Sequence, residues 1–189
     1  EDDYVLIRSM AEMGEKIAQQ MTLMVPQRAG GDTPEDPQYG IFGGAYLTAA
    51  DINRYELKSY DFTVSDAPAR DEIDPGVLVR VFGKEVFEKV KENGFEGITE
   101  KSVPSTKKTV KALLQRAHGF FLQVKNDPET ATFWTALYGR ERVVKLPSAK
   151  VLPQVQAAII GLTEGVLDLQ SLERYLTNEG GLEKDMAQQ

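Results

Sequence analysis

The chain contains 189 residues, 41% of them apolar and 27% charged, which is typical of a folded globular protein and excludes a disordered chain. Its net charge of −7 disfavours nucleic acids and membrane surfaces as partners, and no apolar run is long enough to cross a bilayer. The sequence has no cysteine, so any metal would be held by oxygen atoms rather than by thiolates. Because the acidic N-terminus also lacks a signal peptide, we expect a cytoplasmic protein.

The N-terminal segment predicts a helix followed by a glycine-containing loop. A short apolar run at residues 4–7 precedes methionines and an isoleucine that recur close to helical spacing, which predicts a helix over residues 9–24. Pro26 ends this helix. In the loop that follows, the paired Gly30 and Gly31 permit backbone angles that other residues resist, so the loop can bring oxygen atoms close to a ligand.

The next segment leads into a strand and an acidic turn. Residues 39–53 are rich in small residues and predict a helix lying close against a sheet, and their glycine spacing does not match a dinucleotide-binding fingerprint. Residues 60–64 predict a β-strand, and Ser65-Asp66-Ala67-Pro68 turns the chain at its C-terminal end. Open α/β sheets place their ligand sites at that end of a strand, so Asp66 is positioned for chemistry.

Helices and strands alternate through the rest of the chain. Helical patterns cover residues 77–82, 84–92, 105–117, 128–138 and 148–162, and β-branched or aromatic runs predict two further strands at 119–124 and 142–146. Strands that are separated by helices predict a parallel sheet covered on both faces. A last helix, capped by Asp168, follows a change in composition. We therefore divide the chain into an α/β domain at residues 1–164 and a C-terminal helical extension at residues 165–189, which is either a satellite of the same core or a docking element.

Two loops resemble parts of a von Willebrand factor A (VWA) domain. The sequence Gly30-Gly31-Asp32-Thr33-Pro34-Glu35 resembles the glycine-rich loop that supplies a threonine to the metal-ion-dependent adhesion site of this family. Residues 60–68 resemble the strand that follows in these domains, together with its aspartate. The order of helices and strands through residue 146 is similar to the second half of the VWA fold.

The resemblance implies an α/β fold of three layers around a mostly parallel, doubly wound sheet of VWA or Rossmann-like type. It implies a Mg²⁺ site in which Thr33 offers its hydroxyl, Asp66 binds directly or through a water, and Asp32 is a further candidate ligand. It also implies a protein partner whose acidic side chain completes the metal shell, since Mg²⁺ takes about six oxygen ligands. Without the family, Thr33 would begin the helix after Pro34 and Asp66 would cap a turn.

The chain departs from the family at its beginning, because the first metal-site loop, Asp-x-Ser-x-Ser, does not occur in it. In a doubly wound sheet the strand before that loop lies beside the strand at residues 60–64, so we expect this strand to have an unpaired edge. The missing half would be truncated, unbuilt or supplied by another chain that completes the sheet, and Mg²⁺ binding by this chain alone would be weak or absent. Asp61 and Thr63 make polar and apolar residues alternate along this strand, whereas a central parallel strand is usually apolar throughout. The other interpretation is therefore that the strand is a genuine edge strand of a reduced sheet.

The predicted function is a protein-binding module of VWA type that holds its partner through a Mg²⁺-like site or a remnant of it. Two alternatives stay open: a metal-independent structural subunit of an assembly, and a metal-assisted hydrolase that would use Asp66, Asp71 and Glu72. The chain offers little support for an enzyme, because its single histidine, His118, precedes a strand and no Gly-x-Ser-x-Gly elbow occurs.

Overall fold

The computed structural model describes residues 14–23 and 35–187. The chain divides into two compact units, each assembled from separate stretches of sequence. The first unit comprises Glu1–Thr48 and Ala69–Thr109, and the second unit comprises Ala49–Pro68 and Val110–Gln189. No helix in the described ranges is long and apolar enough to span a bilayer.

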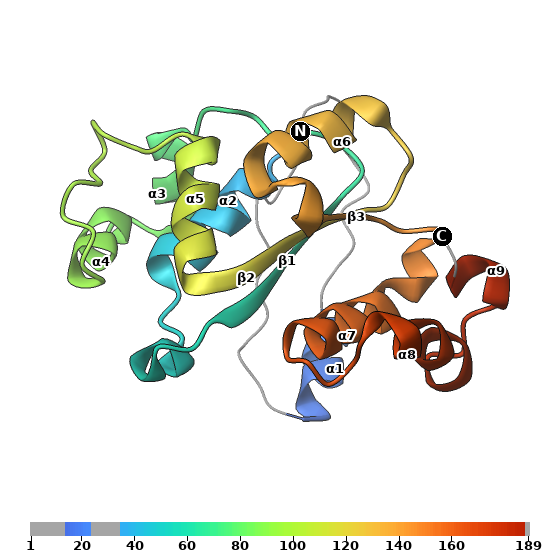
Figure 1. Cartoon of the computed structure of the whole chain (residues 1–189). Coiled ribbons are helices and arrows are strands. Elements are labelled where there is room, and N and C mark those ends of the chain that lie inside the picture. The colour runs from blue at the N-terminus through green and yellow to red at the C-terminus, as the bar shows by residue number, and fades with distance from the viewer. Residues whose placement is uncertain (1–13, 24–34, 188–189) are drawn as a thin grey trace. The chain divides into compact units, whose positions relative to one another are not determined.

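The second unit is organised around a small parallel sheet (Figure 1). The strands lie in the order β1-β2-β3, and all of them run in the same direction. Within the described residues β1 has a neighbour on one side only, as expected for the strand at residues 60–64. All three predicted strands are confirmed. The strands and the longer helices are β1 (Ser59–Ser65), α5 (Thr106–Arg116), β2 (Ala117–Gln123), α6 (Pro128–Tyr138), β3 (Val143–Lys145) and α7 (Leu152–Thr163).

Helices cover both faces of this sheet, which gives an α/β arrangement of three layers. Alternate side chains of a strand point to opposite faces. On one face, Phe121 of β2 stacks on Trp134 of α6, with ring centroids 4.4 Å apart. On the other face, Leu122 packs in an apolar cluster with Ala158 of α7. The coverage of both faces is confirmed, whereas the doubly wound order of a VWA domain stays a prediction, because the described strand order does not reverse.

Helix α6 begins and ends where the sequence predicts. The Asp127 carboxylate accepts a hydrogen bond from the Thr130 backbone N–H at 2.6 Å, and Pro128 occupies the first turn, where a missing N–H costs nothing. Gly139 ends the helix with a φ of 88°, a backbone angle that favours glycine. Because Asp127 closely follows β2, the start of α6 lies at the carboxyl end of the sheet.

The residues after position 164 contribute to the core of the sheet. Asp168 caps the first helix of this segment by accepting a hydrogen bond from the Ser171 backbone N–H, as predicted. Leu176 and Leu182 are buried in the same apolar cluster as Leu122. The extension therefore shares the core of the second unit, while the domain boundary at residue 165 stays a prediction. Its elements are α8 (Leu169–Arg174), the π-helix η5 (Tyr175–Glu179) and α9 (Lys184–Ala187).

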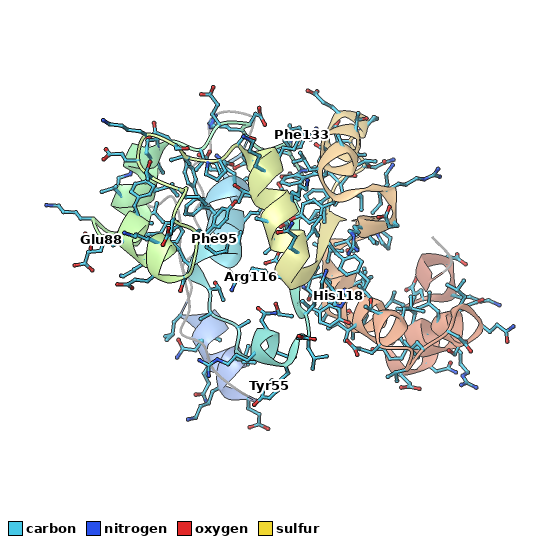
Figure 2. The ribbon with its side chains drawn as sticks, turned by 60° about the vertical axis from the view of Figure 1, so that its left-hand side comes forward. Tyr55, Glu88, Phe95, Arg116, His118 and Phe133 are labelled. Atoms are coloured by element: carbon cyan, nitrogen blue, oxygen red, sulfur yellow. The ribbon has the colours of Figure 1, made fainter. Side chains whose placement is uncertain are left out.

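The first unit is built from short helices around an aromatic core. The ring of Tyr46 meets the rings of Phe42 and Phe95 edge to face, each with centroids 4.9 Å apart (Phe95 is labelled in Figure 2). The predicted helices at residues 77–82 and 84–92 are confirmed. The elements of this unit, besides the start of α5, are α1 (Lys16–Thr22), α2 (Pro37–Phe42), the π-helix η1 (Gly43–Leu47), α3 (Pro75–Phe82) and α4 (Val86–Glu92).

The single helix predicted over residues 39–53 is instead divided. Helix α2 continues into η1 and stops at Thr48, whose backbone is extended, and the 3-10 helix η2 (Asp51–Tyr55) then follows in the second unit. The paired glycines 43 and 44 lie at the change from α-helix to π-helix, whereas the chain leaves the helical conformation only at Thr48. The helix predicted over residues 9–24 is described only in part, as α1.

Substitution of Leu176 tests whether the C-terminal helices share the core of the sheet. We expect Leu176→Ala to lower the free energy of unfolding by about 2–3 kcal/mol, because it removes buried methyl groups from the cluster around Leu122. Urea unfolding followed by the fluorescence of Trp134, the only tryptophan, would measure this. The exposed Leu169→Ala is the matched control, with an expected change below about 0.5 kcal/mol. An unchanged Trp134 transition in Leu176→Ala would show that these helices unfold independently.

Candidate functional site

Polar side chains gather where the parallel strands end, at the edge of the sheet where α/β proteins place their ligand sites. Three of them are the last residues of β1, β2 and β3, one directly follows β1, and three lie between β2 and α6. Every one of them belongs to the second unit. We call this set the carboxyl-end cluster, and it comprises Ser65, Asp66, Gln123, Lys125, Asn126, Asp127 and Lys145.

The centre of the cluster is an ion pair between Asp66 and Lys125. The Lys125 Nζ atom contacts the Asp66 Oδ2 atom, so the loops that follow β1 and β2 are joined by opposite charges. The hydrogen bond from Lys125 lowers the pKa of the Asp66 carboxyl, and the same contact raises the pKa of Lys125. The side chains remain 38% and 74% exposed, respectively, so both charges are accessible to a binding partner.

Helix α6 fixes the turn that carries Asp66. The buried Trp134 Nε1–H donates to the Ala67 carbonyl oxygen at 3.0 Å, and the Thr130 hydroxyl donates to the Asp66 carbonyl oxygen at 3.3 Å. Within the turn, the Ala67 backbone N–H donates to the Ser65 hydroxyl at 3.2 Å. These bonds hold the main chain on both sides of the Asp66 side chain, so its carboxylate is presented from a rigid support.

Two amide side chains extend the cluster toward β3. Gln123 is fully buried at the end of β2 and donates through Nε2 to the Asp127 carbonyl oxygen at 2.8 Å. Its Oε1 atom is buried and has no hydrogen-bond partner among the described residues. Asn126 accepts a hydrogen bond from the Lys145 Nζ atom at 3.1 Å. Two lysines and two aspartates therefore share this edge of the sheet, and the acidic members are both engaged by hydrogen-bond donors.

Of the three predicted metal ligands, the structure describes one. Asp66 lies at the end of β1, as predicted, whereas Thr33 and Asp32 fall outside the described residues. The described end of the predicted loop lies in the first unit, where Glu35 forms a β-bridge with Ala69. The next residue, Asp36, forms an ion pair with Arg70 at 3.0 Å.

The described side chains of the carboxyl-end cluster do not form an oxygen shell for a cation. Asp66 is paired with an ammonium group and Asp127 caps α6, and no group of three or more His, Asp or Glu side chains suited to a metal occurs within the described ranges. Mg²⁺ needs several oxygen ligands in near-octahedral geometry. Its binding by Thr33, Asp32 and Asp66 together stays a prediction.

The residues considered for a hydrolase lie in different surroundings. Asp71 and Glu72 are exposed and belong to the first unit, whereas Asp66 belongs to the second. His118, which is labelled in Figure 2, lies on β2 and packs its ring against Tyr60, with centroids 5.2 Å apart. This contact agrees with the interpretation of His118 as a packed residue rather than a base.

Sequence reasoning missed Lys125, which is the partner of Asp66. A usable signal existed, because residues 125–127 directly follow the predicted strand at 119–124 and therefore reach the same edge of the sheet as Asp66. The burial of Gln123 gave no such signal, since a glutamine at the end of a strand is usually exposed.

Comparison with protein-family models, with curated proteins and with solved structures found no match to the chain. The similarity to VWA domains therefore depends on the loop residues quoted above. The functional interpretation depends on the chemistry of the carboxyl-end cluster.

Removal of the Lys125 ammonium should raise the pKa of the Asp66 carboxyl toward its ordinary value of about 3.9. The carboxyl resonances of Lys125→Ala, followed by ¹³C NMR during an acid titration, would show this change. Because the pKa of Asp66 is lowered by folding, the ion pair stabilises the protein above the unfolded-state pKa, and that contribution is lost as the pH falls through the folded-state value.

Asp127 supplies the internal control for this titration. Its pKa is lowered by hydrogen bonds from Thr130 and not by Lys125, so it should titrate alike in the wild type and in Lys125→Ala. An Asp66 pKa that stays unchanged in the variant would contradict the ion pair.

Proposed function

We propose that this chain is a protein-binding module of VWA type in which the carboxyl-end cluster binds an acidic side chain of a partner protein. In this proposal the cluster is a remnant of a metal-ion-dependent adhesion site, and Lys125 supplies the positive charge that a cation would supply. The observation that carries the proposal is the ion pair between Lys125 and Asp66.

The chemistry of lysine suits this role. An ammonium group has three hydrogen-bond donors, and Asp66 engages one side of the Lys125 group while most of the side chain stays exposed. A partner carboxylate could therefore form a charge-assisted hydrogen bond to Lys125, a type of bond that is shorter and stronger than one between neutral groups. Asp66 would then orient Lys125 in the way that it would orient a bound cation.

The charged groups around Lys125 restrict where a partner carboxylate can bind. Lys145 is exposed and held by Asn126, so a second positive charge lies in the same cluster. Asp66 and Asp127 repel an acidic group that approaches without pairing with a lysine. The arrangement favours a partner that places one carboxylate in a defined position, which is a requirement of specific protein recognition.

Reversal of the charge at Lys125 tests the proposed function. Immobilised wild-type chain should retain a partner protein from an extract of the source organism, and Lys125→Glu should retain it at least about tenfold less, because the partner carboxylate would meet a like charge. Quantitative mass spectrometry of the retained proteins would measure the ratio. A chelator should not change it, since the proposed contact needs no cation.

Lys150→Glu is the matched control, because it reverses an exposed charge outside the cluster. It should retain the same protein as the wild type. Equal retention by Lys125→Glu and the wild type would refute the role of the cluster and leave a metal-independent structural subunit as the better interpretation.

Calorimetric titration distinguishes a remnant site, which binds no cation, from a site that still binds Mg²⁺. We expect Mg²⁺ to produce no measurable heat with the wild type, because Lys125 already neutralises Asp66. Mn²⁺ would be titrated in parallel. Heat that appears in the wild type and is lost in both Thr33→Ala and Asp66→Ala would show that the cation form of the site is correct and that Lys125 is not its substitute.

A further inference from the structure

Strand β1 is the edge strand of the described sheet, and we call its side away from β2 the open edge. All seven of its residues are in register with β2, from Ser59 beside Ala117 to Ser65 beside Gln123, and no described strand pairs with its other side. The main-chain N–H and C=O groups on that side can accept an extended segment, since exposed strand edges bind strands through main-chain hydrogen bonds.

An acidic side chain lies on this strand without an opposite charge. Asp61 is half-buried, and within the described residues no lysine, arginine or histidine forms an ion pair with it. The hydroxyl groups of Thr63 and Tyr138, whose oxygen atoms lie 2.9 Å apart, are close enough to interact with Asp61. Burial raises the pKa of Asp61, and a hydrogen bond with Thr63 opposes this rise only in part. A partly desolvated carboxylate of this kind gains from an added positive charge.

Apolar side chains are exposed on β1 and just before it. Val64 is 39% exposed, and Leu57 and Tyr55 are 57% and 75% exposed (Tyr55 is labelled in Figure 2). Exposed apolar groups next to an open strand edge provide the contact area that a short main-chain pairing lacks. Hydrogen bonding, apolar contact and an unmatched charge thus occur together along residues 55–65.

We propose that the open edge of β1 binds an extended segment of a partner protein, and that this segment carries a lysine or arginine facing Asp61. A second copy of this chain fits less well. If β1 paired antiparallel with itself around Phe62, each Asp61 would face Thr63 of the other copy, and both carboxylates would still lack a basic partner. This surface is distinct in its chemistry from the carboxyl-end cluster, which favours an acidic partner group.

Peptide binding to the 189-residue chain tests this proposal. The probes are synthetic peptides as long as β1, rich in valine and threonine, with a central lysine or a central glutamate. The lysine peptide should bind at least about tenfold more tightly than the glutamate peptide. NMR titration should place the largest amide shifts on β1. A lysine peptide with N-methyl groups on one edge should lose binding, because main-chain hydrogen bonds are required.

Charge variants identify the residue responsible. The preference for lysine should disappear in Asp61→Asn and persist in Glu129→Gln, which removes an exposed charge on α6. A preference that survives in Asp61→Asn, or that vanishes equally in Glu129→Gln, would overturn the proposal. So would shifts that map away from β1. If Asp61 instead protects the edge from pairing, Asp61→Asn would self-associate or bind every peptide more tightly, which sedimentation and the same titrations would reveal.

Discussion

The indole of Trp134 is the contact on which the second unit and its candidate site both depend. The ring stacks on Phe121 of the central strand, and its N–H donates to the carbonyl oxygen of Ala67 in the turn after β1. One side chain therefore attaches α6 to the sheet and fixes the turn that presents Asp66. A buried carbonyl that loses its donor costs about 1–3 kcal/mol, and an aromatic pair contributes about 0.5–1.5 kcal/mol beyond its buried area. Packing and site geometry are coupled through this residue.

The carboxyl end of the sheet and the side of β1 away from β2 differ in how their charged side chains are paired. At the carboxyl end, Asp66 is paired with Lys125, and the Lys125 side chain remains mostly exposed to solvent. On the side of β1 that has no strand partner among the described residues, Asp61 is half-buried and forms no ion pair with a described basic residue. A charge that is already paired can exchange partners at small cost, whereas a partly desolvated charge without a counterion gains more from receiving one. We therefore propose an acidic partner group for the first surface and a basic one for the second.

The spacing of the predicted metal site did not indicate the charged partner of Asp66. That site combines Asp66, which belongs to the second unit, with Thr33 and Asp32, which lie outside the described residues. The described end of the predicted glycine-rich loop, Glu35, pairs with Ala69 within the first unit. Asp66, in contrast, has its nearest charged partner in Lys125 of the second unit. The spacing of residues in a motif does not show that a lysine elsewhere in the chain, rather than a cation, pairs with the carboxylate.

The sequence by itself determined the local elements. The strands, the caps at Asp127 and Asp168, and the end of α6 at Gly139 follow from hydrogen-bonding and backbone preferences that act within a few residues. Only the tertiary structure decided that Lys125 neutralises Asp66 and that Leu176 joins the core of the sheet. Those contacts join residues that are distant along the chain, and no local propensity encodes them. The sequence specifies which side chains are charged or apolar, but the packing of strands and helices determines which residues they contact.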